Sequence, residues 1–203
     1  MSFFDKFQLA SIGAFLLMVV ANTLRLRLGK GINPIAVGRG KKGLPLVIEL
    51  FAFFALAVWL IEIVLRATHS AYRIFPAAID PALLDFALVR MFGTFVVTVA
   101  ILLFIFAFLS FGSSWRVGLD PKTPGQLVTG GAFSISRNPI FVALDLWFIG
   151  IFLVQGSVFF LVFALVAMLL IHTQILREEK LLTELHGQSY RDYLKRAPRY
   201  LIW

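Results

Sequence analysis

Long runs of apolar residues alternate with short polar connections along the chain. A helix needs roughly 20 mostly apolar residues to cross a bilayer, and five segments meet or approach that length. These predicted spans cover residues 7–28, 44–65, 83–111, 140–154 and 158–175. Gln155-Gly156-Ser157 separates the last two, which predicts the turn of a helical hairpin. The pattern therefore predicts an all-α fold: a polytopic membrane helix bundle of five transmembrane helices with a cytosolic C-terminal helical tail.

Composition supports this interpretation. Of the 203 residues, 60% are hydrophobic and 15% are charged, whereas a soluble domain is about half apolar and about a quarter charged. A chain of this length could not bury the excess in a water-facing core, so we expect a single membrane domain over residues 1–203. Residues 1–111 hold three spans, and residues 112–203 hold the hairpin and the tail. The absence of cysteine excludes disulfides, thiolate metal sites and cysteine nucleophiles.

The basic residues indicate an orientation. Most of the 19 Lys and Arg residues follow the first span, follow the third span, or lie in the tail, which is one side of a five-span topology. Cytoplasmic loops carry such an excess, so we expect a bacterial inner-membrane protein with its N-terminus outside and its C-terminus in the cytosol. Orientation and anionic lipid account for the net charge of +8, and no nucleic-acid binding is predicted. Near the outer ends of adjacent spans, Glu62 and Arg90 are predicted to form a structural ion pair.

The predicted cytosolic side carries two long polar segments, residues 112–139 and 177–203. The first ends in Ser136-Arg137-Asn138-Pro139, directly before a span. Proline suits the first turn of a helix, which places Arg137 and Asn138 at a helix N-terminus. Free backbone N–H groups and a guanidinium there would suit a carboxylate. The alternative is that Arg137 is an anchor at the membrane interface.

Two further positions inside the hairpin are candidates for chemistry. Asp145 shares a helix face with Asn138, and an acid within a span predicts either a functional group or a hydrogen bond between helices. The fifth helix is predicted to continue into the tail, so His172 and Glu179 share a face about 10 Å apart. No second His or Cys stands at ligand spacing from His172, and no metal site is predicted.

Four motifs stand in an order and spacing that resemble the isoprenylcysteine carboxyl methyltransferase-like family, whose relatives include the membrane phospholipid N-methyltransferases. The resemblance covers roughly residues 112–200. The motifs are Gly130-Gly131-Ala132-Phe133, Ser136-Arg137-Asn138-Pro139-Ile140-Phe141, Arg177-Glu178-Glu179 and Gly187-Gln188-Ser189-Tyr190-Arg191-Asp192-Tyr193. The family often has His at position 138, Tyr at position 141 and Gly at position 143, where this chain has Asn, Phe and Ala.

The resemblance implies an S-adenosylmethionine-dependent methyltransferase that binds its cofactor on the cytosolic side and takes a lipophilic acceptor from the bilayer. Residues 112–203 would then be the cofactor-binding half. Arg137, Glu179 and Asp145 are the expected catalytic residues. The expected cofactor-binding residues are Gln126, Leu127, Val128, Gly130, Gly131, Arg137, Asn138, Pro139, His172, Glu178, Glu179 and Tyr190.

Methyl transfer from a sulfonium depends on positioning, a dry site and electrostatics, and it needs no metal. The acceptor stays open among an isoprenylcysteine-like carboxylate, a phospholipid amine and a small thiol. An amine would need a base, and Asp145, His172 and Glu179 are all candidates. Two other classes are alternatives. One is a sterol-reductase-like NADPH oxidoreductase, because the C-terminal half also resembles that of membrane sterol reductases, and the other is a non-enzymatic small transporter or lipid-binding protein. The sequence does not predict an oligomeric state.

Overall fold

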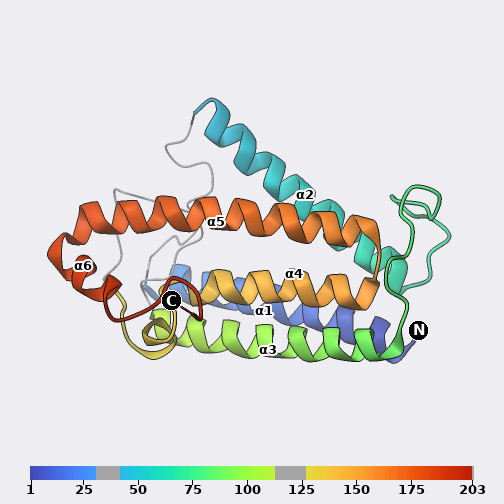
Figure 1. Ribbon diagram of the computed structural model, residues 1–203, viewed down its shortest axis with the longest axis horizontal. Coiled ribbons are helices and arrows are strands. Elements are labelled where there is room, and N and C mark those ends of the chain that lie inside the picture. Colours follow the sequence, from blue (N-terminus) through green and yellow to red (C-terminus); the bar gives the residue numbers. More distant parts are fainter. Residues whose placement is uncertain (31–41, 113–126, 203) are drawn as a thin grey trace.

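The computed structural model describes residues 1–30, 42–112 and 127–202, and most of these residues form helices (Figure 1). The described part holds no strand beyond an isolated bridge between Ala82 and Ser157. The predicted all-α class is therefore confirmed. The elements are α1 (Phe3–Lys30), α2 (Leu44–Ala67), α3 (Ala87–Phe111), the 3-10 turn η2 (Gly131–Ser134), α4 (Pro139–Gln155), α5 (Val158–His186) and α6 (Gln188–Leu194).

Four of the helices, α1, α2, α3 and α5, are long and apolar enough to cross a membrane. The chain is accordingly an integral membrane protein. α4 has 17 residues, which at about 1.5 Å per residue is about 25 Å, less than the roughly 30 Å of a hydrocarbon core. The count of five spans remains a prediction.

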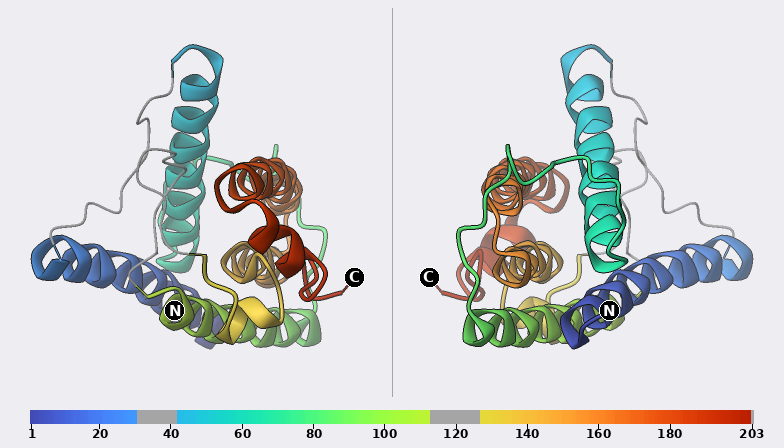
Figure 2. Two further views of the ribbon diagram at one scale, coloured as in Figure 1. Left: turned by 90° about the vertical axis from the view of Figure 1, so that its left-hand side faces the viewer. Right: turned by 90° about the vertical axis from the view of Figure 1, so that its right-hand side faces the viewer.

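The predicted hairpin is present: α4 and α5 run antiparallel, and α3 lies along the other side of α4 (Figure 1). α1 packs on α3, whereas α2 leans away from the bundle, as the end views show (Figure 2). α4 is the most enclosed of these helices, with eight of its residues buried. It is therefore the element on which the others assemble.

Aromatic side chains form the centre of the bundle. The Trp147 ring of α4 stacks on Phe15 of α1 with centroids 4.2 Å apart. It also meets Trp59 of α2 edge-on at 5.2 Å, and Trp59 in turn stacks on Phe163 of α5 at 5.2 Å. Offset and edge-on pairs of this kind each contribute about 0.5–1.5 kcal/mol beyond their buried area. This aromatic group therefore ties four helices together.

The turn between α4 and α5 requires glycine. Gly156 has φ +65°, and a Cβ there would lie 1.9 Å from the carbonyl oxygen of Leu84. The N–H groups of Leu83 and Leu84 both donate to the Gly156 carbonyl oxygen, at 2.6 and 3.0 Å. The segment before α3 is therefore held against the hairpin turn. For this reason the third helix begins at Ala87 rather than at the predicted residue 83.

The predicted ion pair between Glu62 and Arg90 is wrong. Glu62 is fully buried and accepts from Arg66 Nε at 2.8 Å, one helical turn along α2. Arg66 also pairs with Asp80, while Arg90 pairs with Asp85 at 2.8 Å. Arg66, at the i+4 position, is a closer partner for Glu62 than a residue on another helix.

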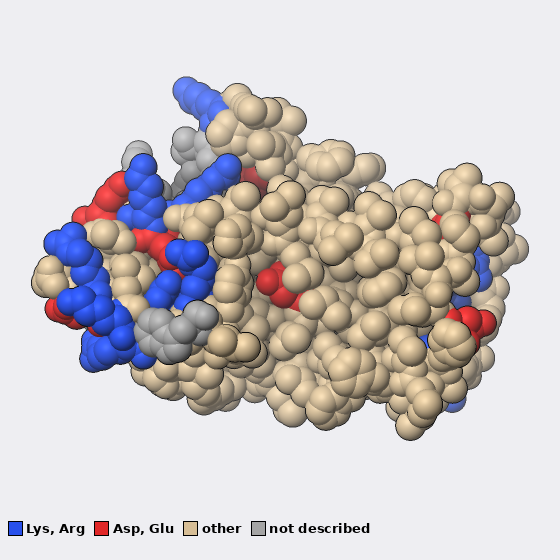
Figure 3. Space-filling view, viewed as in Figure 1, with Lys and Arg blue, Asp and Glu red and all other residues tan. Residues whose placement is uncertain are grey.

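Charged side chains gather at the two ends of the bundle and leave its middle largely apolar (Figure 3). Most of the Lys and Arg visible on this face lie at the end that carries α6. Such a distribution is expected when the ends lie in the polar layers of a membrane and the middle lies in hydrocarbon. The two polar ends of the bundle therefore differ in charge, with more Lys and Arg visible at the end that carries α6.

We predict that the contact between α3 and α4 depends on two glycines. A Cβ on Gly150 would lie 2.6 Å from Val97 Cγ2 and 2.9 Å from the Val97 nitrogen, and a Cβ on Gly93 would lie 2.9 Å from the Gly150 oxygen. Gly150→Ala should therefore lower the free energy of unfolding by about 1–3 kcal/mol because the helices must separate. Thermal unfolding in detergent measures the change.

The control is Gly13→Ala in α1, where a Cβ has nothing within 4 Å. Alanine in an exposed helix should be neutral or stabilise by up to about 1 kcal/mol. Equal melting of Gly150→Ala and Gly13→Ala would show that the close approach of α3 and α4 does not matter for stability.

Candidate active site

The start of α4 is bonded to the C-terminal segment of the chain. Pro139 occupies the first turn, as predicted, and lacks the backbone donor that this position leaves unused. The Arg137 N–H donates to the Pro198 carbonyl oxygen at 2.8 Å, and the Asn138 N–H donates to Ser136 Oγ at 3.0 Å. These bonds fix the direction in which Arg137 and Asn138 project.

Glu179 of α5 is the centre of the site. Its Oε1 accepts from Arg137 Nε at 3.1 Å and from Asn138 Nδ2 at 3.2 Å. Its Oε2 accepts from Arg199 Nε at 3.0 Å and from Arg199 Nη2 at 2.8 Å. Glu179 is only 8% exposed. The structure thus brings together three residues that the sequence placed in the site, and adds Arg199.

Two guanidiniums around one carboxylate leave a net charge of +1 on this group of three. The Glu179 carboxylate beside it raises the pKa of Arg199, so Arg199 remains protonated at all physiological pH values. Charge-assisted bonds of this kind are about twice as strong as neutral ones. The remaining positive charge makes the group suitable for an anion.

The last residues of the chain are held by the same side chains. Arg137 Nη1 donates to the carbonyl oxygens of Leu194 and Ala197, at 3.2 and 2.7 Å. The Arg199 carbonyl oxygen accepts from Ser136 Oγ and from Asn138 Nδ2, each at 3.1 Å. Arg137 is therefore largely occupied within the protein. Its predicted role toward an external carboxylate is left to Nη2, for which no partner occurs in the described ranges.

Asp145 and His172 lie at one level, deeper in the bundle. α4 and α5 are antiparallel, and each of these residues is seven positions from the Asn138–Glu179 contact, which is about 10 Å along either helix. His172 Nδ1 is hydrogen-bonded to the hydroxyl of Tyr200. Within the described residues, Asp145 Oδ1 is buried and has no hydrogen-bond partner. Burial, and then the Asp145 carboxylate, raise the pKa of Tyr200.

A small apolar cluster supports the site from the side of the tail. It is made by the buried residues Phe133, Tyr190, Tyr193 and Ala197, against which Leu127 and Val128 pack. The Tyr193 hydroxyl donates to the Phe133 carbonyl oxygen at 2.6 Å. Burial raises the pKa of Tyr193 to about 12 and also raises that of Tyr190, so both hydroxyls stay neutral. Leu127, Val128 and Tyr190 thus meet in one cluster, and Tyr190 lies near enough to Glu179 for the carboxylate charge to act on its hydroxyl.

The other expected cofactor residues do not bond to the Glu179 group. Gly131, with φ +61°, approaches α3 so closely that a Cβ would lie 2.3 Å from Ser110 Oγ. Gly130 beside it is exposed, with open space where a side chain would be. Glu178 is half-buried and accepts from Gln174 Nε2 at 3.0 Å. Gln126 is outside the described residues. Within the described ranges, no group of His, Cys, Asp and Glu could hold a metal ion.

A model of the phospholipid methyltransferase family matches residues 88–189, half of the chain. The chain belongs to that family. The matched region runs from the start of α3 to the start of α6 and contains Arg137, Asn138, Asp145, His172 and Glu179. No curated protein matches the sequence. The family consists of membrane methyltransferases. Methyl transfer is also the activity that the motifs indicated.

Sequence reasoning missed Arg199 and Tyr200 in this phospholipid methyltransferase family member. Both lie beyond the matched region, and no helical spacing relates them to α4 or α5. The available signal was the run Arg196-Ala197-Pro198-Arg199-Tyr200, in which a proline and an aromatic residue interrupt a basic tail. Such a run indicates a docked segment rather than a solvated one.

Glu179→Gln should destabilise the protein, because it removes the charge that the two guanidiniums share. Breaking a buried pair costs about 3–5 kcal/mol. Arg199 is 39% exposed, so solvent screening reduces the expected loss to about 2 kcal/mol. Thermal unfolding in detergent measures it. Glu184→Gln, the same change at an exposed position of α5, should stay within about 0.5 kcal/mol of the unaltered protein. Equal stability of the two variants would mean that Glu179 does not hold the site together.

Proposed function

We propose that this protein is an S-adenosylmethionine-dependent methyltransferase whose acceptor is the amine of a membrane lipid. The observation that carries the proposal is the arrangement of two levels between α4 and α5. A positively charged Arg137–Glu179–Arg199 group lies at the end of the helices. Half-buried Asp145, whose Oδ1 has no hydrogen-bond partner among the described residues, lies seven residues deeper. The family match supports methyl transfer, and the levels supply an anion site and an amine site.

The residues of the outer level fit the cofactor. S-adenosylmethionine carries a carboxylate, and the net charge of +1 at Arg137, Glu179 and Arg199 suits it. It also carries an amine and a ribose, which suit the half-buried carboxylate of Glu178. Gly130 has open space beside it, so a ligand can approach the backbone there. When bound, the cofactor supplies an activated methyl group on a positively charged sulfur.

The deeper level fits the acceptor. A lipid headgroup reaches the site from the bilayer, and an amine must lose a proton to react as a nucleophile. Within the described residues, Asp145 Oδ1 has no hydrogen-bond donor, so it is available to accept that proton. His172 and Tyr200 are bonded to each other, and we assign them to positioning the headgroup. A carboxylate or thiolate acceptor would arrive charged and would gain nothing from Asp145.

We place the site at the cytosolic face. The methyl donor is water-soluble and made in the cytosol, and the end of the bundle that carries α6 shows most of the Lys and Arg on the visible face (Figure 3). Excess basic charge marks the cytoplasmic side of a membrane protein. The N-terminus, at the other end of the bundle (Figure 1), is then outside.

Proteoliposomes that contain phosphatidylethanolamine and methyl-labelled S-adenosylmethionine test the activity. We expect label in the lipid extract, in the amine headgroup, with the purified protein and none without it. Liposomes in which phosphatidylcholine replaces the amine lipid are the control, because its nitrogen is already fully methylated. Label in neither lipid, under conditions where the protein binds S-adenosylhomocysteine, would refute the lipid amine as acceptor.

Asp145→Asn should lower the rate of methyl transfer by about 10²–10⁴-fold, the usual contribution of a general base. Binding of S-adenosylhomocysteine, measured by calorimetry, should change less than threefold, because the cofactor is assigned to the outer level. Asp192→Asn on α6, whose carboxylate is exposed, is the matched control and should transfer methyl groups at the unaltered rate. A normal transfer rate in Asp145→Asn would contradict the role of Asp145 as a base. Weakened binding of S-adenosylhomocysteine with no other change would show that Asp145 contacts the cofactor and not the acceptor.

A further inference from the structure

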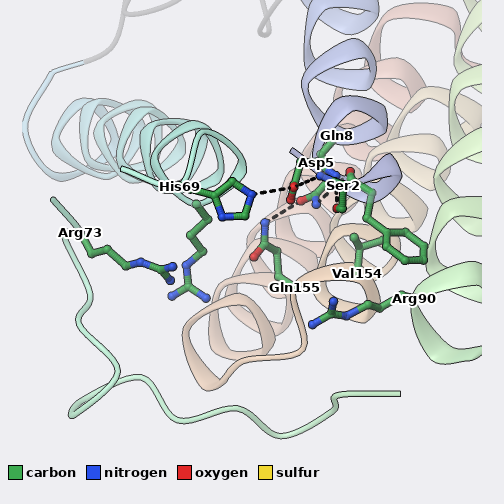
Figure 4. A pocket seen from close by; sticks show the side chains of 10 residues that line it. Ser2, Asp5, Gln8, His69, Arg73, Arg90, Val154 and Gln155 are labelled. Atoms are coloured by element: carbon green, nitrogen blue, oxygen red, sulfur yellow. Dashed lines mark hydrogen bonds and ion pairs between the residues drawn. The ribbon is translucent and has the colours of Figure 1, made fainter. Parts of the chain in front are cut away.

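A polar cavity lies at the opposite end of the bundle from Glu179. It has a volume of about 320 Å³, at the lower end of the range for small-molecule sites. Its walls come from the start of α1, the end of α2 and the loop after it, the start of α3 and the end of α4. Figure 4 shows Arg73 and Arg90 approaching it from opposite sides, with Asp5 and His69 between the helices.

Some of the charged side chains around this cavity already have partners within the protein, and others do not. Arg66 offers no positive charge to a ligand, because it pairs with both Glu62 and Asp80, and these three side chains carry a net charge of −1. The two carboxylates also accept from the Ile74 N–H, the Ser157 hydroxyl and the Phe159 N–H. The Asp5 carboxylate is also occupied: Oδ2 accepts from the Ser2 nitrogen at 2.5 Å and contacts His69 Nε2 at 3.0 Å. The acidic side chains near the cavity are therefore largely committed to partners within the protein.

Two guanidiniums retain donors. Arg73 is exposed, and no hydrogen bond or ion pair joins it to any other described residue. Arg90 reaches Asp85 through Nη2, an exposed pair, while its Nε is buried without an acceptor in the described part of the chain. An unpaired buried donor is destabilising, and a bound acceptor would satisfy it. The two guanidiniums therefore have donors left for an anionic acceptor.

The backbone at His69 gives a second indication. His69 has φ +53° and is, among the described residues, the non-glycine residue with positive φ. Strain of this kind persists only where the surroundings impose it, and it clusters at binding sites. Here it brings the imidazole to Asp5, across the mouth of the cavity (Figure 4). The contact keeps Asp5 Oδ2 occupied by partners within the protein.

We propose that this cavity binds a phosphate group, held by Arg73 and Arg90 with His69 at its edge. A guanidinium presents paired donors that match two phosphate oxygens. The phosphate belongs either to a phospholipid headgroup in the leaflet opposite the Glu179 group or to free inorganic phosphate. This site is independent of the proposed methyl transfer and uses none of its residues.

The test compares Arg73→Gln and Arg90→Gln with Lys6→Gln, which removes the same charge from an exposed residue at the same end of the bundle. Native mass spectrometry of the full chain measures how much phosphatidylglycerol stays bound. Thermal unfolding with inorganic phosphate or chloride at equal ionic strength measures free phosphate. We expect at least fivefold weaker retention of the lipid, or loss of the phosphate-induced shift, in both arginine variants and not in Lys6→Gln. The arm that responds identifies the source.

Two results would overturn the proposal. One is that all three variants match the unaltered protein in both arms. The other is that Lys6→Gln loses as much as the arginine variants, which would indicate attraction to the surface charge and no defined site. If Arg90→Gln does not fold, Arg73→Gln decides alone, because Arg73 has no partner in the described structure whose loss could unfold it.

Discussion

The buried carboxylate of Glu179 is the interaction on which the rest of this end of the protein depends. It joins three pieces of chain that are far apart in sequence: the start of α4, the exit of α5 and the segment that ends in Tyr200. Without it, the positive charges of Arg137 and the partly exposed Arg199 would face each other with no carboxylate between them. The same carboxylate closes the C-terminal segment over the hairpin, and that closure brings Tyr200 to His172.

The register of the hairpin determines which residues of α4 lie opposite which residues of α5. Because α4 and α5 are antiparallel and joined by the tight turn at Gly156, the contact of Asn138 with Glu179 determines that Asp145 is level with His172. A slip of one residue would turn each helix by about 100° and would move all four side chains off the shared face. The glycine contact of α3 with α4 holds this register from the other side. Packing far from the site therefore sets its geometry.

Hydropathy was sufficient to predict the helices, because lipid requires long apolar segments with satisfied backbones. The resemblance to the isoprenylcysteine carboxyl methyltransferase-like family was sufficient to predict that Arg137, Asn138 and Glu179 lie together. The pairing of Glu62 with Arg90 failed because Arg66, one turn away, was a nearer partner. Arg199 and Tyr200 escaped prediction because their segment is held mainly through its backbone carbonyl oxygens. Any residue type could supply those oxygens, so the sequence signal is limited to the proline and the aromatic residue within the basic run 196–200.

The short length of α4 explains why polar networks stand at both of its ends. A helix of about 25 Å leaves its terminal groups in surroundings of low dielectric, and unpaired polar groups there cost several kcal/mol each. At its start, Asn138 bonds to Glu179 and to the Arg199 carbonyl oxygen. Just beyond its end, Ser157 donates to Asp80 at 2.9 Å, and Asp80 is only 5% exposed. The constraint that forces these networks to exist also concentrates charged side chains where ligands can meet them. Chemistry at the two ends of this bundle is thus a consequence of enclosing a short helix in its centre.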